Sequence, residues 1–537
     1  MNLRRLLLAL ASAALLILAW PPRMLAPLSL IAFIPLLWVI RDIHDDQALS
    51  GRQGRWVFRY SWIAFFIWNI ACSWWIYNAH WSGMVASTLF NSSVMALIMV
   101  LYYRSRKALG PKKALIALPM YWLSFEHIIL RWDMSWPWMN LGNVFANLPS
   151  LVQWYEFVGT SGGTLWIWLV NLLLYAWVAR FKSNFQVGRQ VLRLFVRIVI
   201  IVLIPMALSL QLRSHFNNSD EVTDVVVVQP NVDPYGEKFK IDESTQVRRI
   251  LALADSVMDQ NVDFVLVPET ALPGGLQEGR LEREPSIVLI RRWLAKYPNT
   301  TMIIGASTYR IYDNPRQASA TARYSERGQY YYDMYNTALQ ISASDSIGVY
   351  HKSQLVVGVE KMPFRQVLKP LLGEVAIDLG GTTGTLGTQE QRAVFSHTSK
   401  EINIAPVICW ESVFGEYVTE YAVNGADFLG IITNDGWWGD TDGYKQHFAY
   451  ARLRAIENRR AVARSANTGI SGFIDAKGTP LQSLEWDAAG ALRQKISINR
   501  EATLYQQVGD IIGRIALFLA VIFLMYAFVR RRIGSKE

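Results

Sequence analysis

The segment "EINIAPVICWES", residues 401–412, predicts a buried β-strand that ends at a thiol. Cys409 is one of only two cysteines in the 537-residue chain, and Trp410 and Glu411 follow it directly. A lone cysteine is often a small buried hydrophobe. A single cysteine that cannot pair is also typical of a free reactive thiol. Its place at a strand end, beside a carboxylate, makes Cys409 a candidate nucleophile.

Short apolar runs alternate with helical patterns on both sides of this strand. Later segments such as "AVARSANTG" and "SGFIDAKGTP" predict hairpins. This order of elements predicts a mixed α/β sandwich in which helices cover the sheets. The strands are predicted at 224–229, 263–269, 301–307, 401–411 and 427–435, and the helices at 246–260, 286–297, 413–424 and 444–459.

The rest of the chain is rich in Leu, Ile, Trp and Phe. A membrane-spanning helix needs about 20 mostly apolar residues. Eight segments fit: 5–20, 27–41, 57–77, 84–103, 114–130, 161–179, 194–212 and 511–529. We read the first as a helix rather than a cleaved signal peptide, because another apolar segment follows almost at once. Three parts are therefore predicted: a transmembrane region of about seven helices over 1–212, a globular domain over 213–507, and a C-terminal transmembrane helix with its tail over 508–537.

Basic residues gather in alternate loops of this predicted helical bundle. They precede the first segment, lie between the fourth and fifth and between the sixth and seventh, and follow the eighth. Positive charge prefers the cytoplasmic side, so both termini are predicted to be cytoplasmic and the globular domain to lie on the other side. The net charge of +10 is largely explained in this way. No basic module with interleaved aromatic residues indicates nucleic-acid binding.

Two further reactive side chains end predicted strands. Glu269 ends "DFVLVPE", and Lys352 ends the second strand of a hairpin. Each alone is most simply a surface residue, but with Cys409 they form a set. A carboxylate can take the proton of a thiol, and a fixed ammonium can stabilise a thiolate and an oxyanion. The set predicts acyl transfer through a thioester, with no metal-type Cys/His spacing and no cofactor.

Four motifs, "VPETALP", "YHKSQLVVGVE", "VICWES" and "TNDGWWG", resemble in that order those of the carbon–nitrogen hydrolase (nitrilase) superfamily. With the eight apolar segments, "LAWPP" and "HFAYARLRAIENRRAVARSANTG", the whole chain is similar to the apolipoprotein N-acyltransferase family. The resemblance implies a nitrilase-like αββα sandwich on the periplasmic side of a multi-pass protein of the bacterial inner (cytoplasmic) membrane. It implies transfer of an acyl chain from a membrane phospholipid to the cysteine, and then to the amine of the diacylglyceryl-cysteine of an apolipoprotein. We expect a monomer.

The resemblance also implies roles for individual residues. Glu269 matches the general base, Lys352 the lysine that stabilises the oxyanion, and Cys409 the nucleophile. Glu360 matches a second glutamate next to the lysine motif, although "LVVGVE" stands where "LVPFGE" is usual. These four residues are the expected centre of the site.

The aromatic positions follow the family less closely. Trp410, with Glu411, matches the aromatic–acid pair after the nucleophile, where the family often has Tyr. A functional Trp in the arm after the first strand is missing, and Phe239 or Tyr235 lies near that point.

Trp437 and Trp438 follow a strand end at Asn434. They are candidates either for substrate contact at the membrane interface or for core packing.

Three other interpretations remain open at this level. A membrane-anchored amidase would use the same three residues with water as the acceptor. A papain-like enzyme would pair Cys409 with His351, His397 or His447, but its local signature is absent and Glu269 and Lys352 stay unexplained. A non-catalytic lipid-binding scaffold would have no use for the intact Glu, Lys and Cys.

Overall fold

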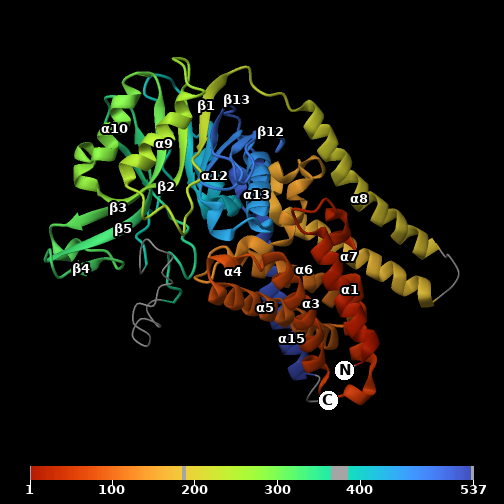
Figure 1. Cartoon of the computed structure of the whole chain (residues 1–537). Helices are drawn as coiled ribbons and strands as arrows, with labels where there is room; N and C mark the ends of the chain where they lie inside the picture. Colours follow the sequence, from red (N-terminus) through yellow and green to blue (C-terminus); the bar gives the residue numbers. More distant parts are fainter. Residues whose placement is uncertain (1, 184–188, 365–384, 534–537) are drawn as a thin grey trace. The chain divides into compact units, whose positions relative to one another are not determined.

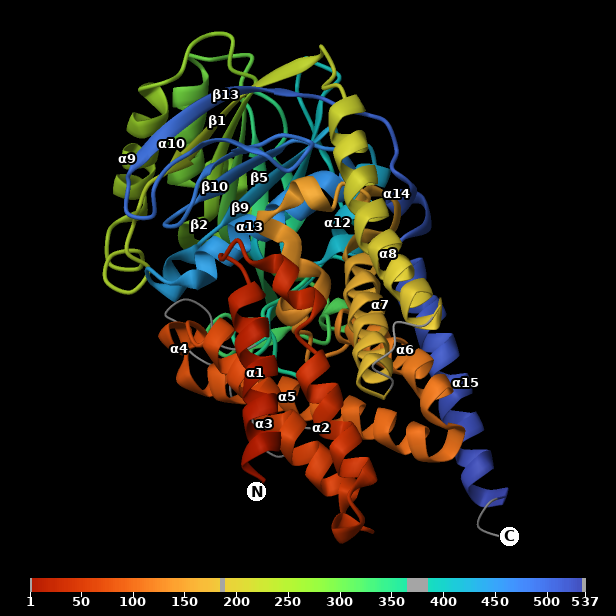
Figure 2. The same cartoon turned by 90° about the vertical axis from the view of Figure 1, so that its right-hand side faces the viewer.

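The computed structural model describes residues 2–183, 189–364 and 385–533. The chain forms two compact units (Figures 1 and 2). One contains Met1–His215 and Val508–Glu537, and the other contains Phe216–Gln507.

The first unit is helical. Within it, α5 packs against α3 and α6, α15 packs against α6, and α7 packs against α8. Helix α7 is interrupted at Gly159, whose φ of 63° and ψ of −168° lie outside the helical region. The main helices are α1 (Leu3–Ala19), α2 (Ile34–Asp45), α3 (Gln53–Ser73), α5 (Trp81–Leu109), α6 (Pro111–Ile129), α7 (Tyr155–Ser183), α8 (Arg189–His215) and α15 (Ile511–Ile533).

Helix is present at each of the eight predicted membrane segments. Within the described ranges, five helical segments are long and apolar enough to cross a membrane: Ala26–Asp45, Trp81–Leu109, Tyr155–Arg180, Arg189–His215 and Ile511–Ile533. The other three are shorter or more polar. Helix α1 has 17 residues, α3 carries Arg55 and Arg59, and α6 carries Lys112, Lys113 and Glu126. The predicted helical bundle is confirmed. Among the described residues, five of its helical segments have the length and apolar composition of a membrane-spanning helix.

The second unit contains two sheets. The first has the order β13-β1-β2-β3-β5-β4, with β6 also paired to β5. Strands β1, β2 and β3 are parallel, and the outer pairs are antiparallel. These strands are β1 (Val222–Gln229), β2 (Phe264–Gln277), β3 (Thr301–Tyr312), β4 (Arg323–Ser325), β5 (Tyr330–Ile341), β6 (Gly348–His351) and β13 (Gly490–Ser497).

The second sheet has the order β12-β11-β10-β9-β8-β7. Strands β8, β9 and β10 are parallel, and β10 and β11 form the predicted hairpin. The strands are β7 (Phe395–Ser396), β8 (Asn403–Ile408), β9 (Phe428–Thr433), β10 (Val462–Ala466), β11 (Gly472–Ile474) and β12 (Pro480–Ser483).

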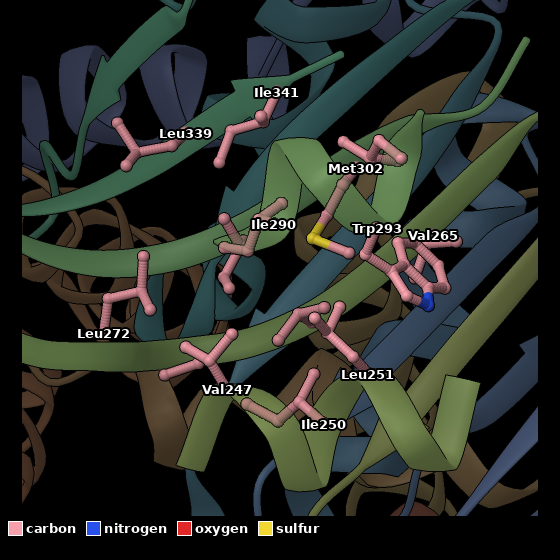
Figure 3. Packing of buried hydrophobic residues seen from close by; sticks show 14 of the residues in the cluster. Val247, Ile250, Leu251, Val265, Leu272, Ile290, Trp293, Met302, Leu339 and Ile341 are labelled. Carbon is pink, nitrogen blue, oxygen red and sulfur yellow. The ribbon is translucent and has the colours of Figure 1, made fainter. Parts of the chain in front are cut away.

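Helices α9 (Glu243–Asp255) and α10 (Pro285–Leu294) cover the outer face of the first sheet (Figure 1). Helix α9 presents Val247, Ile250 and Leu251 at helical spacing, which forms an apolar stripe. Figure 3 shows these side chains beside Val265 of β2 and Ile290 of α10. Helices α12 (Gly415–Val423) and α13 (Asp442–Asn458) pack against the second sheet.

The two sheets pack directly on each other. The rings of Phe264 in β2 and Phe428 in β9 meet edge to face with centroids 5.3 Å apart. Both faces of each sheet are therefore covered, which explains why the central strands are continuous apolar runs. The predicted αββα sandwich is confirmed. Carboxyl ends of parallel strands commonly carry the functional site. Cys409 follows the parallel strand β8, whereas Glu269 lies within β2, which continues past the predicted strand end to Gln277, and Lys352 follows the antiparallel strand β6.

Candidate active site

Glu269 lies in an irregular part of β2. The register of β2 against β3 shifts between Val267 and Leu272, and Thr270 has a φ of 49°. Gly305 of β3 lies opposite, where an added Cβ would be 2.5 Å from the Cα of Glu269. The bare backbone of Gly305 lets the two strands approach closely at the point where Glu269 is displayed.

A buried lysine joins two carboxylates at this strand end. Lys352 follows β6 directly and is 1% exposed. Its Nζ lies 2.9 Å from Oε1 of Glu269 and 3.0 Å from the carboxylate of Glu360. Asn336, from β5, donates its Nδ2 to both carboxylates, at 2.8 Å and 2.9 Å. The main-chain N–H of Asn434, after β9, donates to Oε2 of Glu269 at 3.1 Å. The two sheets therefore share this carboxylate.

The charges of this cluster are set by its contacts. Burial alone would raise the pKa of Glu269, but Lys352 and then Asn336 outweigh it and hold the pKa below its ordinary value. Burial alone would lower the pKa of Lys352, but Glu269 and Glu360 raise it well above the usual range. Glu269 is therefore an ionised carboxylate at neutral pH, able to accept a proton, beside a permanent ammonium.

Cys409 begins the 3₁₀ turn η8 (Cys409–Val413) directly after β8. Its φ of 48° is left-handed, a conformation that costs a residue with a Cβ roughly 1–3 kcal/mol and is common at active sites. The residue is 7% exposed. Burial raises the pKa of its thiol, the Glu269 carboxylate adds to this, and Lys352 opposes it. The thiol is therefore protonated at rest, and its proton must leave during the reaction.

Glu411 links the 3₁₀ turn that begins at Cys409 to the loop that begins at Lys352. Its carboxylate is completely buried and accepts the main-chain N–H groups of Ile408, at 2.9 Å, and Ser353, at 2.7 Å. These two residues are the chain neighbours of Cys409 and Lys352. The same carboxylate accepts three hydroxyl groups, those of Tyr350, Tyr417 and Tyr421. Glu411 is thus a structural link between two parts of the site.

A second buried hydrogen-bond network, centred on His447 of α13, contacts the turn Cys409–Val413. The Nε2 of His447 lies 2.9 Å from the hydroxyl of Ser412 and 3.3 Å from the main-chain oxygen of Cys409. Its Nδ1 lies 2.9 Å from Asp435, whose other oxygen accepts a hydrogen bond from Arg464 at 2.7 Å. All of these side chains are buried.

The predicted aromatic residues lie in different environments. Trp410 is 3% exposed and packs edge to face on Phe414. Trp437 and Trp438 are half-buried, and the ring of Tyr235 meets that of Trp437 at 5.1 Å. Phe239 is 44% exposed. The structure therefore brings Tyr235, rather than Phe239, against the predicted tryptophan pair.

Two polar residues that contact Glu269, Asn336 and Lys238, are not predicted from the sequence. Asn336 lies within β5 with no adjacent turn, and Lys238 lies in a polar segment that reads as solvent-exposed. For Asn336, the one indication of burial in the sequence is the strand alternation of "YNTALQIS", which puts Asn336 on the same face as Ala338. In the part of the chain that the structure describes, no group of His, Cys, Asp and Glu has a metal-binding arrangement.

Comparison with known families agrees with this geometry. Residues 225–505 match the family model described as carbon–nitrogen hydrolase, and residues 12–173 match the N-terminal domain model of apolipoprotein N-acyltransferase. The chain therefore belongs to the carbon–nitrogen hydrolase family.

Proteins called apolipoprotein N-acyltransferase are similar to the chain over nearly its whole length. The one from Chlorobaculum tepidum is 28% identical over 521 residues, which cover 96% of this chain and 94% of that protein. The one from Geobacter metallireducens is 24% identical over 540 residues, with 99% and 96% covered. The resemblance predicted from the four motifs is confirmed.

We expect Glu411→Gln to destabilise the turn Cys409–Val413. The amide would turn an NH₂ group toward buried donors and leave at least one unpaired, at a cost of about 1–3 kcal/mol. For a unit of this size the melting temperature of the full-length protein in detergent should fall by roughly 2–5 °C. Glu401→Gln, an exposed carboxylate before β8, is the matched control and should melt like the wild type. Equal melting of both variants would contradict the linking role of Glu411.

Proposed function

We propose that the protein transfers a fatty acyl chain from a membrane phospholipid to the N-terminal amine of a diacylglyceryl-cysteine on apolipoproteins, through a thioester on Cys409. The observation that carries this proposal is a buried ion pair of Lys352 and Glu269 that acts on the pKa of the buried Cys409 thiol. The same chain continues at both ends of this unit into apolar helices, α8 and α15. The phospholipid donor and the lipid-modified acceptor both lie in the bilayer, so a catalytic unit attached to the membrane can bind both there. The name shared by the relatives supports the same activity.

In the first half-reaction, Glu269 takes the proton of the Cys409 thiol as the sulfur attacks the ester carbonyl of the phospholipid. The ammonium of Lys352 stabilises the oxyanion of the tetrahedral intermediate. The carbon–oxygen bond then breaks, and Glu269 returns the proton to the leaving alkoxide. The products are a lysophospholipid and an acyl thioester. The high pKa of the thiol and the low pKa of Glu269 require proton transfer to occur with the attack.

In the second half-reaction, the neutral amine of the acceptor attacks the thioester carbonyl. Glu269 takes a proton from the attacking nitrogen, and the carbon–sulfur bond breaks. The thiolate recovers its proton from Glu269, which completes a ping-pong cycle. We assign the proton transfers to Glu269 rather than Glu360, because the Glu269 carboxylate is among the main groups that shift the pKa of the Cys409 thiol and Glu360 is not. The Glu360 carboxylate accepts from Lys352, Asn336 and the N–H of Val356. Its role is to position Lys352.

Two other enzymatic activities are less well supported. An amidase would use the same residues with water as acceptor, but it would need no set of apolar helices. A Cys–His enzyme would need a histidine free to act on the thiol. His397 is bonded to the main-chain oxygen of Asn299, and His351 stacks on Tyr335. The ring nitrogens of His447 face Asp435 and Ser412.

The protein is a multi-pass inner-membrane enzyme, with residues 213–507 in the periplasm and both termini in the cytoplasm. The alternating loop charge supports this orientation. The enzyme works as a monomer without cofactor, and Trp437, Trp438 and Phe239 contact the lipid substrates.

A topology reporter tests the orientation. A reporter that is active only in the cytoplasm, fused after Lys536, should be active, and the same reporter inserted at the exposed site Asn314 should be inactive. The reverse result would refute the proposed orientation.

The nucleophile assignment is tested by two cysteine variants. Cys409→Ala should abolish acylation of a diacylglyceryl peptide, because no other group can form the thioester. Cys72→Ala is the matched control: it removes the other thiol, which is buried in α3, and should keep nearly full activity. The measurement is product formation by mass spectrometry at equal amounts of membrane-inserted protein. Acylation by the Cys409→Ala variant would refute the assignment of Cys409 as the nucleophile.

The roles of the other two residues are tested in the first half-reaction alone. Glu269→Gln removes the base, and acyl-enzyme formation should slow by about 10²–10⁴-fold. Lys352→Met removes the ammonium and should slow it by about 10²–10³-fold or more. Acyl-enzyme accumulation is followed with and without acceptor peptide, and the peptide should rescue neither variant. Normal accumulation in Glu269→Gln would show that Glu269 serves aminolysis alone.

A further inference from the structure

A second lysine is buried beside the proposed catalytic centre. Lys238 lies after β1 and is 3% exposed, whereas its neighbours Phe239 and Lys240 are exposed. Its Nζ donates to the main-chain oxygen of Glu269 at 3.4 Å and to the hydroxyl of Thr270. The ammonium therefore reaches the point at which the backbone of β2 departs from regular geometry.

The segment that carries Lys238 is held on both sides. Gln246, from α9, donates its Nε2 to the main-chain oxygens of Lys238, at 2.8 Å, and Ile241, at 3.0 Å. The hydroxyl of Tyr235 donates to the main-chain oxygen of Trp437 at 2.9 Å. The inward direction of Lys238 thus belongs to an ordered segment that lies beside the site.

The charges of the centre balance only when Lys238 is included. Glu269 and Glu360 carry two negative charges, and Lys352 carries one positive charge. Proton transfer from Cys409 to Glu269 during the attack moves one negative charge from Glu269 through the sulfur to the oxyanion without changing the total. A surplus negative charge in a buried site opposes each of these states. A second ammonium removes the surplus throughout the reaction.

We propose that Lys238 is a charge-balancing residue of the active site, whose ammonium stabilises the negative charge that moves from Glu269 to the Cys409 sulfur and on to the oxyanion. The inference rests on the proposed thioester chemistry and adds a second cation to it. Lys352 makes the direct contacts, whereas Lys238 acts through its electric field.

The remaining charged groups around Cys409 are paired with one another: Glu269 and Glu360 with Lys352, and Asp435 with Arg464. The imidazole of His447 also lies against Asp435. Burial lowers the pKa of Lys238 to about 8, while Glu269 and Cys409 oppose this shift. The ammonium is therefore present below about pH 8 and is lost above it. Its effect on the thiol should disappear over the same range.

The test is the rate at which iodoacetamide alkylates Cys409 in the full-length protein in detergent, followed on the Cys409 peptide by mass spectrometry. Near pH 7, Lys238→Met should slow alkylation about tenfold, which corresponds to a thiol pKa raised by about one unit. Near pH 9.5 the two rates should agree within about twofold, because the wild-type lysine is then neutral. Lys240→Met, an exposed lysine two residues away, is the matched control and should follow the wild type at every pH.

Two results would overturn the inference: equal rates near pH 7, or a rate ratio that stays constant with pH, which is the mark of a packing role. If Lys238→Met does not give monodisperse protein, Lys238→Gln replaces it, because its amide keeps a donor toward Thr270 without the charge. Acyl transfer by Cys409→Ala decides the proposed function separately. Transfer in that variant would refute the thioester route, while the alkylation profiles would still decide whether Lys238 tunes the thiol.

Discussion

The burial of the Lys352 ammonium between the carboxylates of Glu269 and Glu360 is the interaction on which the site depends. An isolated charge at 1% exposure would be strongly destabilising. Here the two carboxylates and the amide of Asn336 compensate it. Because the four groups come from β2, β5 and the segment after β6, satisfying the ammonium also fixes these segments relative to one another. The cost of breaking one partner of such a cluster, about 3–5 kcal/mol, keeps the arrangement rigid.

The second sheet adds Cys409, the proposed nucleophile, to the groups that surround this cluster. Cys409 occupies a left-handed conformation that its surroundings must maintain. Glu411 helps to maintain this conformation by accepting the N–H groups of Ile408 and Ser353. The pair of His447 and Asp435 supports it through the contact of His447 with the main-chain oxygen of Cys409. The thiol is thus held protonated next to an ionised base. In the proposed reaction such a site needs no permanent thiolate, because the charge develops only when the thiol attacks a substrate carbonyl.

Much of the architecture can be predicted from the sequence, because apolar runs such as "DFVLVPE" and "EINIAPVICWE" mark the central strands. The second run ends at Cys409 as predicted, but β2 does not end at Glu269: it continues to Gln277 through an irregular register that the apolar pattern does not reveal. The αββα sandwich and the helical bundle follow from such patterns and from the family resemblance. Asn336 and Lys238 cannot be found in this way. Asn336 is internal to a strand, and the polar neighbours of Lys238 hide its burial. The linking role of Glu411 depends on donors from separate segments, which no local pattern brings together.

The most direct measurement is the mass of the wild-type protein after incubation with phospholipid in the absence of an acceptor. If the thioester forms on Cys409, one fatty-acyl adduct per chain is expected, located on the Cys409 peptide and removed by neutral hydroxylamine. Addition of a diacylglyceryl peptide should then remove the adduct and yield the N-acylated peptide. An adduct on another residue, or N-acylated peptide formed while Cys409 is never acylated, would contradict the account.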